Sequence, residues 1–269
     1  MGFKNHDRRH EESLKGSKSQ ITLLMPANAL IKAVTFDVAG TLIEPWPSVG
    51  HVYSEVAVAH GFEPIAPALL NEAFVRAWKT KGQFDYSPSA WRELVQMTFA
   101  EWIARPPADG MFDAFFHGLY RRFESAAAWR IFEDVFPTLA ELKKLGLKLG
   151  VISNWDERLR PLLNNLDLSR QFDVLVLSIE TGFAKPAPEI FRRAALLLDA
   201  PLETILHVGD NIAEDYYGAL SAGMQAVSLS RQGAAAEGNY PAGAGPAGIT
   251  LLSELPALLE KQADGVGRD

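Results

Sequence analysis

The sequence contains no cysteine among its 269 residues. A chain without cysteine forms no disulfide framework, carries no thiolate nucleophile and has no zinc–thiolate site, which excludes several classes of enzyme. Basic residues are in the minority, because 26 Lys and Arg stand against 33 Asp and Glu for a formal net charge of −7. They form no concentrated run that would neutralise a phosphate backbone, so we expect no nucleic-acid partner.

Long apolar segments are missing near the N-terminus. Residues 1–20 are charged and lack apolar periodicity, and the apolar run Ile21–Met25 is too short for a signal-peptide core or a membrane span. We expect residues 1–29 to form a flexible tail, and we expect a cytoplasmic protein without a membrane partner. No Gly-x-Gly-x-x-Gly follows an expected strand, no Gly-Lys-Ser/Thr loop occurs, and Ser153 is not in a Gly-x-Ser-x-Gly elbow. These absences argue against a dinucleotide-binding protein and a serine hydrolase.

At 48% hydrophobic residues, the chain can build a sizeable interior. Short apolar runs typical of buried strands alternate with helical patterns, which predicts an α/β fold with a Rossmann-like parallel sheet and helices on both faces. The expected strands are 33–38, 148–153, 172–178, 205–209 and 226–230, and the expected helices are 138–145, 157–166, 188–198, 213–222 and 253–261.

Residues 44–133 read as helices only, with apolar residues mostly three or four positions apart. We expect this segment to be an all-helical cap domain inserted into a core of residues 30–43 and 134–269. The many aromatic residues of the cap are expected to pack a small bundle and not to bind a cofactor.

Polar side chains stand where the expected strands end. Asp37 ends the first strand, and Ser153 with Asn154 ends the second. Taken singly, each fits a turn or a helix N-cap equally well. Because ligands of parallel sheets bind at the carboxyl ends of the strands, we expect these side chains to meet there.

Two further signals belong to the same edge of the sheet. Lys185 lies in a loop just before a helix, where a lone lysine is usually solvated, and Asp210 ends a strand with Asp215 five residues later. Two carboxylates converging with Asp37 would make a hard oxygen site suited to Mg²⁺. The joint placement of all these groups at strand ends predicts an active site.

This combination resembles the haloacid dehalogenase superfamily of hydrolases, in the class whose cap is inserted after the first strand. The residues that match its four motifs are Asp37 with Thr41, Ser153, Lys185, and Asp210 with Asp215. The resemblance covers nearly the whole chain from Ile31 onward. The amino-acid sequences of segments 90–92, 152–156 and 207–211 are similar to those of a subgroup named after a rhythmically expressed gene.

The resemblance implies a Mg²⁺-dependent hydrolase, favouring a phosphatase of a small phosphorylated metabolite. Asp37 would be the nucleophile that forms an aspartyl phosphate, Thr41, Ser153 and Lys185 would be catalytic, and Asn154 would bind substrate. The implied metal ligands are Asp37, the backbone carbonyl of Ala39, Asp210 and, in support, Asp215. The expected partner is a small phosphorylated molecule, and the expected assembly is a monomer or a homodimer.

Ala39 departs from the superfamily pattern. Its phosphatases carry a second Asp there, which protonates the leaving group, and loss of such an acid costs typically about 10² to 10⁴ in rate. We favour a phosphatase that acts on good leaving groups or that borrows a proton donor from the cap. The donor candidates are His51, Tyr53, Glu55 and His60, and candidate cap contacts to a substrate anion are Arg76, Lys79 and Arg92.

Three other readings stay open. A 2-haloacid dehalogenase also lacks the second Asp, but it needs no metal, so Asp210 argues against it. A phosphonatase-like C–P hydrolase would use Lys79 or Lys81 of the cap as a Schiff base. A non-catalytic relative that binds a phosphorylated ligand is compatible with Ala39, although such a protein has little need for a nucleophile.

Overall fold

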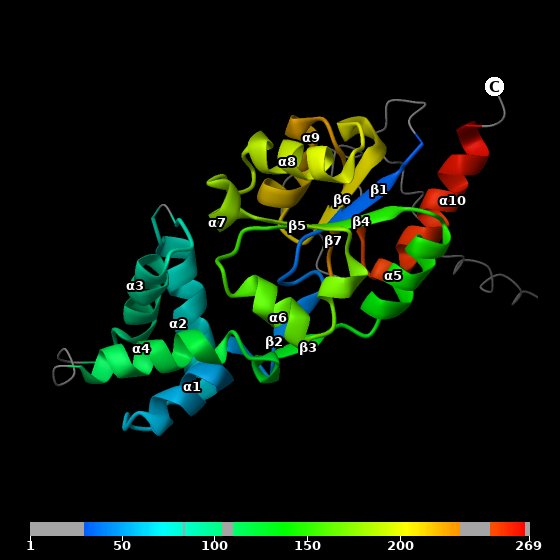
Figure 1. The fold of residues 1–269 in the computed structure, drawn as a ribbon. Helices are drawn as coiled ribbons and strands as arrows, with labels where there is room; N and C mark the ends of the chain where they lie inside the picture. The colour runs from blue at the N-terminus through cyan, green and yellow to red at the C-terminus, as the bar shows by residue number, and fades with distance from the viewer. Residues whose placement is uncertain (1–29, 83, 104–109, 232–247, 267–269) are drawn as a thin grey trace, which may run out of the picture.

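The computed structural model describes residues 30–82, 84–103, 110–231 and 248–266, the last six by their backbone alone. Its centre is a parallel six-stranded sheet in the order β5-β4-β1-β6-β7-β8 (Figure 1). The strands are β1 (Ala33–Phe36), β4 (Lys148–Ser153), β5 (Val174–Leu177), β6 (Ile205–Gly209), β7 (Gln225–Leu229) and β8 (Gly248–Ile249). The predicted fold class is confirmed. The expected tail, 1–29, lies outside the described residues.

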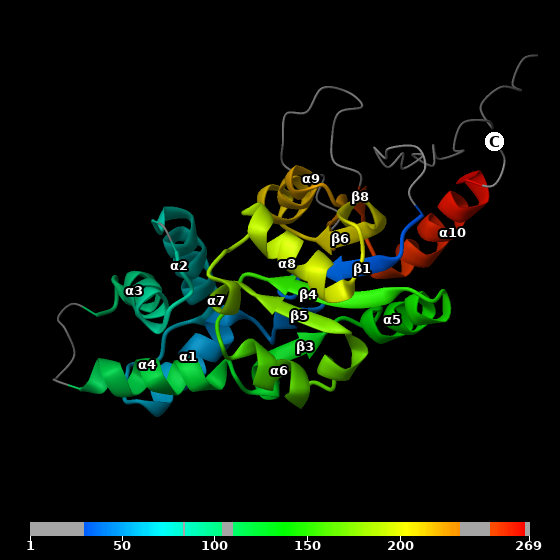
Figure 2. The ribbon, with the colours of Figure 1, turned by 45° about the horizontal axis from the view of Figure 1, so that its top comes forward.

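Helices cover both faces of the sheet (Figure 2). One face packs against α5 (Val135–Lys144), α6 (Leu159–Asn165) and α10 (Leu255–Val266), and the other against α8 (Pro188–Leu198) and α9 (Gly218–Ala222). The strands are buried nearly throughout, and this burial explains why they read as apolar runs without alternation. At about 25 cal/mol per Å² of apolar surface, these two layers provide the main driving force for folding of the core.

The register of β1 brings its neighbours' ends to one edge. Phe36 pairs with Val151 of β4 and with Val208 of β6. Asp37 therefore directly follows Phe36, the last paired residue of β1. Ser153 and Asp210 come two residues after Val151 and Val208, the partners of Phe36. The sheet thus delivers all three side chains to its carboxyl edge.

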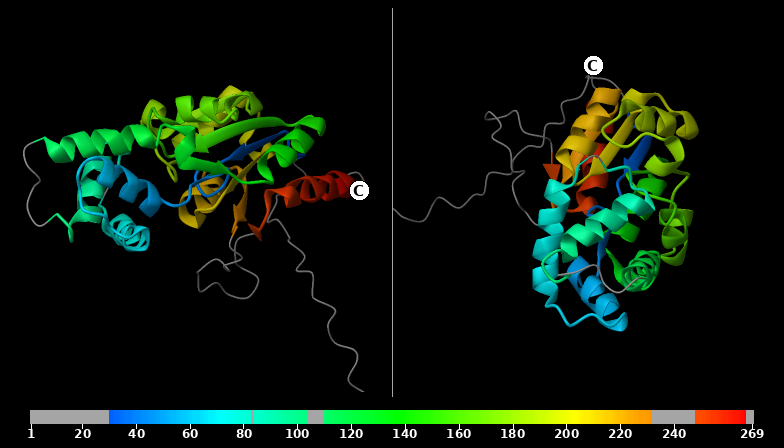
Figure 3. Two further views of the ribbon diagram at one scale, coloured as in Figure 1. Left: turned by 90° about the horizontal axis from the view of Figure 1, so that it is seen from below. Right: turned by 90° about the vertical axis from the view of Figure 1, so that its left-hand side faces the viewer.

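Among the described residues between β1 and α5, four α-helices form a lobe beside that edge (Figure 3). The helices are α1 (Val49–Ala59), α2 (Pro67–Thr80), α3 (Pro88–Phe99) and α4 (Met111–Arg122). The chain enters through β2 (Ile43–Pro45) and leaves through its antiparallel partner β3 (Trp129–Ile131). The bounds 44–133 remain our proposal for the cap.

Part of the aromatic content packs this lobe as expected. Tyr53, Phe99 and Phe115 are buried together in its interior. Tyr53 also lines a pocket that faces the core, together with Trp78 and Trp91. Aromatic residues of the lobe therefore both pack its interior and form a pocket wall.

The segment after β6 departs from the predicted α-helix 213–222. Residues Ile212–Tyr217 form a π-helix that leads into α9. The Asn211 side chain caps its start by accepting hydrogen bonds from the backbone N–H groups of Ala213 and Glu214. Single π turns inside helices occur often at functional sites, and this one carries Asp215.

Among the described residues, no helix is both long enough and apolar enough to cross a bilayer.

Candidate active site

Asp37 lies directly beyond β1 and is nearly buried, with 9% of its surface exposed. Its Oδ1 atom accepts hydrogen bonds from Lys185 Nζ at 2.6 Å and from Ser153 Oγ at 3.2 Å. Burial raises the pKa of Asp37 and the charge of Lys185 opposes that rise. The strand-end residues that the sequence singled out therefore meet.

Lys185 is buried between two carboxylates. Its ammonium also donates to Asp215 Oδ1 at 2.5 Å. Burial opposes the charge, but Asp215 and Asp37 overcome this and raise the pKa of Lys185, so the lysine stays protonated. A solvated surface lysine is thus excluded at this position.

Asn154 holds the Lys185 loop in place. Its Oδ1 accepts from the Lys185 backbone N–H at 2.6 Å, and its Nδ2 donates to the Lys185 carbonyl at 2.9 Å. The same Nδ2 donates to Glu214 Oε2 at 3.0 Å. Asn154 also lines the pocket, so its predicted role in substrate binding stays open beside this positioning role.

An acidic cluster stands beside the lysine. Asp37, Asp210 and Asp215 each offer a carboxylate oxygen within 4.8 Å of the other two. Asp210 lies at the exposed side of the cluster; partial desolvation and the charges of Asp37 and Asp215 raise its pKa to about 7. Lys185 and His207 lower the pKa of buried Asp215 despite the opposing desolvation.

The cluster fits a divalent cation. Carboxylate oxygens are the ligands that hard ions such as Mg²⁺ prefer. Desolvation, followed by repulsion from Asp37 and Asp215, raises the pKa of Asp210, and a bound cation would offset that repulsion. Ala39, whose carbonyl is the predicted fourth ligand, lines the pocket next to Asp37.

Gly40 makes room for Asp210. It has φ +78°, and a Cβ at this position would overlap the Asp210 carboxylate. Only a glycine combines this left-handed backbone with so close an approach. The predicted tight turn after Asp37 therefore also sets the position of a carboxylate from another strand.

His207 is a site residue that sequence reasoning missed. It is fully buried within β6, with Nε2 3.3 Å from Asp215 Oδ1 and Nδ1 2.9 Å from Thr35 Oγ1. Burial lowers the pKa of His207, so the ring is neutral, donates from Nε2 to Asp215 and accepts from Thr35. The only sequence signal was a polar residue inside an apolar strand.

Thr41 is less directly placed than its motif predicts. It is fully buried in the turn after Asp37, and its hydroxyl has no hydrogen-bond partner among the described residues. Its carbonyl accepts two hydrogen bonds from Arg231, at 2.6 and 3.1 Å. Its catalytic role stays a prediction.

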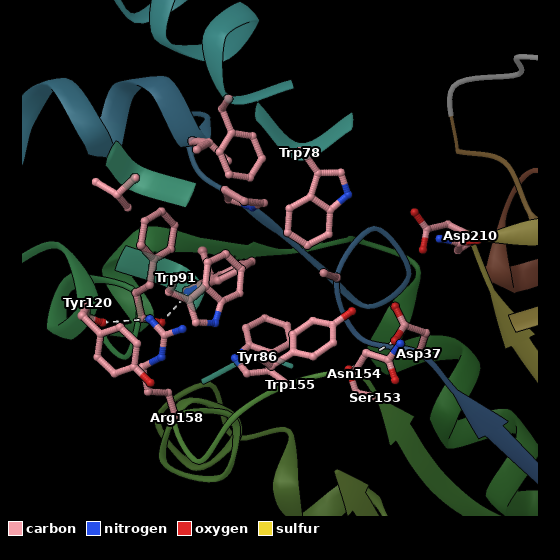
Figure 4. A pocket seen from close by; sticks show the side chains of 18 of the residues that line it. Asp37, Trp78, Tyr86, Trp91, Tyr120, Ser153, Asn154, Trp155, Arg158 and Asp210 are labelled. Carbon is pink, nitrogen blue, oxygen red and sulfur yellow. Dashed lines mark hydrogen bonds between the residues drawn. The ribbon is translucent and has the colours of Figure 1, made fainter. Parts of the chain in front are cut away.

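A pocket runs from the acidic cluster toward the helical lobe (Figure 4). Asp37, Ser153 and Asn154 lie at one end, and Tyr120 and Arg158 lie at the other. The wall between them is largely apolar and aromatic, and it includes Tyr53, Phe74, Trp78, Tyr86, Trp91, Phe116, Phe123, Trp129 and Trp155. The space is therefore suited to an organic group with apolar or aromatic surface.

Arg158, also missed from the sequence, ties this pocket to the lobe. It is nearly buried and forms a bidentate pair with Asp156, at 2.8 and 2.6 Å. It donates to the Tyr120 carbonyl at 3.1 Å, and its guanidinium lies 3.5 Å from the Tyr120 ring centroid. Such a planar, stacked pair holds a fixed geometry.

The charged cap residues chosen from the sequence lie away from the described pocket wall. All of them except Lys79 have a polar, charged or aromatic neighbour among the described residues: His51 contacts Ser48, Glu55 pairs with Arg122, His60 contacts the Val56 carbonyl, Arg76 pairs with Glu101, Arg92 pairs with Asp113, and Lys81 lies 3.8 Å from the Trp78 ring centroid. Of the donor candidates, Tyr53 does reach the pocket, with its ring packed among phenylalanines.

Tyr86, which was not among the residues selected from the sequence, lines the pocket from the cap. It lies between α2 and α3, is 8% exposed, and has Asn154 as a polar neighbour. Figure 4 shows its hydroxyl directed toward Asp37. Its loop position gave no periodic signal from which a role could be predicted.

The fold and the site together define an α/β enzyme with a lysine-braced acidic site at the carboxyl edge of its sheet. Residues 31–223 match the family model of haloacid dehalogenase-like hydrolases. The chain therefore belongs to this family of hydrolases, as its motifs indicated.

Known relatives agree with this assignment. The chain is 33% identical over 245 residues to haloacid dehalogenase-like hydrolase domain-containing protein 3 of Danio rerio, covering 87% of this chain and 98% of that protein. It is 29% identical over 209 residues to the rhythmically expressed gene 2 protein of Drosophila melanogaster, covering 71% and 80%. A solved HAD phosphatase from Thermococcus onnurineus superposes with a TM-score of 0.59 at 25% identity, covering 85% of this chain and 98% of that one.

Proposed function

We propose that this protein is a Mg²⁺-dependent phosphatase that hydrolyses a small phosphorylated molecule through an aspartyl phosphate on Asp37. The observation that carries the proposal is the shared contact of Lys185 with Asp37 and Asp215, beside a third carboxylate from Asp210. The similarity to a solved HAD phosphatase supports the same reaction class.

The chain's own residues suit in-line attack by a carboxylate. Lys185 and Ser153 both engage Oδ1 of Asp37, which fixes the orientation of the carboxylate and leaves Oδ2 as the attacking oxygen. The ammonium of Lys185 also lowers the energy of negative charge that collects on the transferred phosphoryl group.

Asp37, the Ala39 carbonyl and Asp210 would hold Mg²⁺, with Asp215 in support. The bound ion would neutralise charge on the phosphoryl oxygens and fix their geometry. Asp215 is in turn oriented by His207 and by the Asn211 N–H, which donates to Oδ2 at 3.0 Å. Such outer contacts keep a ligand in one orientation.

The pocket wall supports a substrate whose organic part has apolar or aromatic surface. Trp91 and Trp155 both line it, and Arg158 is already neutralised by Asp156. A reaction that requires Mg²⁺ and a small phosphorylated molecule fits a cytoplasmic location, which remains part of this proposal.

Two rival reactions are less well supported. The carboxylates at 210 and 215 favour a metal-assisted reaction over metal-free removal of a halide. Lys185 is the lysine among the described pocket residues, and it comes from the core, whereas Lys79 and Lys81 do not line the pocket. A Schiff base from the cap, as in C–P cleavage, therefore lacks a candidate there.

The test is a substrate panel assayed with Mg²⁺ and with a chelator. It contains aryl and alkyl phosphate esters, an acyl phosphate, phosphonoacetaldehyde and a 2-chloro acid. We expect phosphate release from the esters with Mg²⁺ only. Chloride release in the presence of chelator, or turnover of phosphonoacetaldehyde alone, would replace the phosphatase assignment, and binding of phosphate without any turnover would favour a non-catalytic protein.

A further inference from the structure

The carboxylate site lacks an obvious source for one proton. When Asp37 attacks phosphorus, the bond from phosphorus to the leaving oxygen breaks and its electron pair stays on that oxygen. An alkoxide formed in this way is strongly basic and requires a proton. Ala39, two residues after Asp37 and part of the pocket wall, has only a methyl group to offer.

Three other proton-bearing groups at the pocket have partners that fix their roles. Lys185 is held between two carboxylates, and Ser153 donates to Asp37. Tyr120 donates to Glu157 at the opposite end of the pocket. None of these is placed to give a proton to a leaving group that points from Asp37 toward the cap.

Tyr86 meets this requirement. It lines the same pocket as Asn154 and Asp37, and its hydroxyl is directed toward Asp37 (Figure 4), close enough to Glu214 and Lys185 for their charges to act on it. Burial, followed by the negative charge of Glu214, raises the pKa of Tyr86, so its proton is retained. The hydroxyl thus stands at the junction between the acidic end and the aromatic end of the pocket.

The backbone of Tyr86 shows that this placement is enforced. Its φ is +62°, a left-handed value that bulky residues adopt rarely. The ring is held edge-on by Phe84 at 5.1 Å and by Trp91 at 6.5 Å between centroids. Strained conformations of this kind persist where the surroundings determine them, and they gather at functional sites.

We propose that Tyr86 is the proton donor of this site, supplied by the cap in place of a group on the Asp37 turn. The proposal rests on the proposed phosphatase function. In the first step the Tyr86 hydroxyl gives its proton to the leaving oxygen as Asp37 forms its bond to phosphorus. In the second step the tyrosinate takes a proton from water, the water oxygen bonds to phosphorus, and Asp37 leaves as a carboxylate.

The test compares full-length wild-type protein and Tyr86→Phe in Mg²⁺ on three esters: p-nitrophenyl, phenyl and benzyl phosphate. Nitrophenolate is a weak base and leaves without a proton, whereas the benzyl alkoxide is a strong base and needs a proton in order to leave. We expect kcat of Tyr86→Phe to fall about 10² to 10⁴-fold on benzyl phosphate and less than about threefold on p-nitrophenyl phosphate, with phenyl phosphate between. The variant keeps the ring, so its Mg²⁺ affinity and circular dichroism should match wild type.

Two control variants make the readout specific. Tyr120→Phe removes a hydroxyl at the other end of the pocket and should change all three rates by one common factor. Glu214→Gln removes the carboxylic acid that hydrogen-bonds to Asn154 and should also act uniformly. A selective loss on benzyl phosphate in Glu214→Gln would overturn the proposal by assigning the proton to Glu214.

A uniform loss in Tyr86→Phe, or no loss, would contradict the donor role alone. Absence of turnover by wild type on all three esters would contradict the phosphatase function and the donor with it.

Discussion

Lys185 Nζ lies 2.6 Å from Asp37 Oδ1, although 148 positions separate the two residues in the chain. Both side chains are buried, and the lysine reaches Asp215 as well. A buried ammonium shared by two buried carboxylates makes the site and the stability of the core depend on one residue.

Replacing Lys185 with Met is expected to destabilise the protein by about 3–5 kcal/mol, because two buried carboxylates lose their shared cation. Chemical denaturation at pH 7.5 with a chelator measures the change in the free energy of unfolding. Lys144→Met, at an exposed position, serves as the control and should stay within about 0.5 kcal/mol of wild type. A loss below about 1 kcal/mol for Lys185→Met would mean that the contacts of Lys185 with Asp37 and Asp215 do not stabilise the fold.

Binding of Mg²⁺ is expected to weaken as the pH falls through 7. The raised pKa of Asp210, about 7, means that this carboxyl is mostly ionised at pH 8 and mostly protonated at pH 6 in the metal-free protein. A ligand must lose its proton to bind the ion, so the apparent affinity should drop about tenfold from pH 8 to pH 6. Isothermal titration calorimetry at several pH values measures this.

Asp210→Asn separates this effect from others. The variant should bind Mg²⁺ more weakly at pH 8 and lose most of the dependence on pH. An affinity that is constant or rises between pH 8 and pH 6 in wild type would rule out Asp210 as a titrating ligand.

A methyl group at Gly40 is expected to disrupt metal binding. Gly40→Ala places a Cβ against the Asp210 carboxylate at a φ of +78°, so both strain and displacement follow. Gly146→Ala is the matched control, because Gly146 has φ +76° and open space around it. Each change should cost roughly 1 kcal/mol of stability from backbone strain.

The two variants differ in the second readout. Gly40→Ala should weaken Mg²⁺ binding at least about tenfold, whereas Gly146→Ala should leave it unchanged. Equal Mg²⁺ affinities in the two variants would show that the position of Asp210 does not depend on the space at Gly40.

The meeting of the strand-end side chains at one edge of the sheet could be predicted from the sequence, for a physical reason. Asp37, Ser153 and Asp210 all follow apolar runs, and parallel pairing brings the ends of such runs to one edge of the sheet. Lys185 and Asp215 could be assigned to the same edge because each lies just beyond an expected strand or near the start of an expected helix. The predicted sheet and its flanking helices follow from the same patterns.

Residues whose roles depend on how the cap faces the core were not predictable. Tyr86 belongs to an irregular connection, and nothing in its neighbours' spacing indicates that its side chain lies beside Asn154. Two of the donor candidates on α1 do not line the pocket, for a related reason. His51 and Glu55 lie on parts of that helix whose side chains contact Ser48 and Arg122 and not the pocket.

The covalent role of Asp37 is the centre of this account, and trapping its phosphorylated form tests it most directly. Wild-type protein is mixed with a ³²P-labelled aryl phosphate and Mg²⁺, quenched with acid within a turnover, and digested for mass spectrometry. We predict label on the peptide that contains Asp37, none in Asp37→Asn, and a fall in kcat of that variant by roughly 10³ to 10⁶-fold. Turnover by wild type without label on that peptide, or full activity of Asp37→Asn, would contradict it.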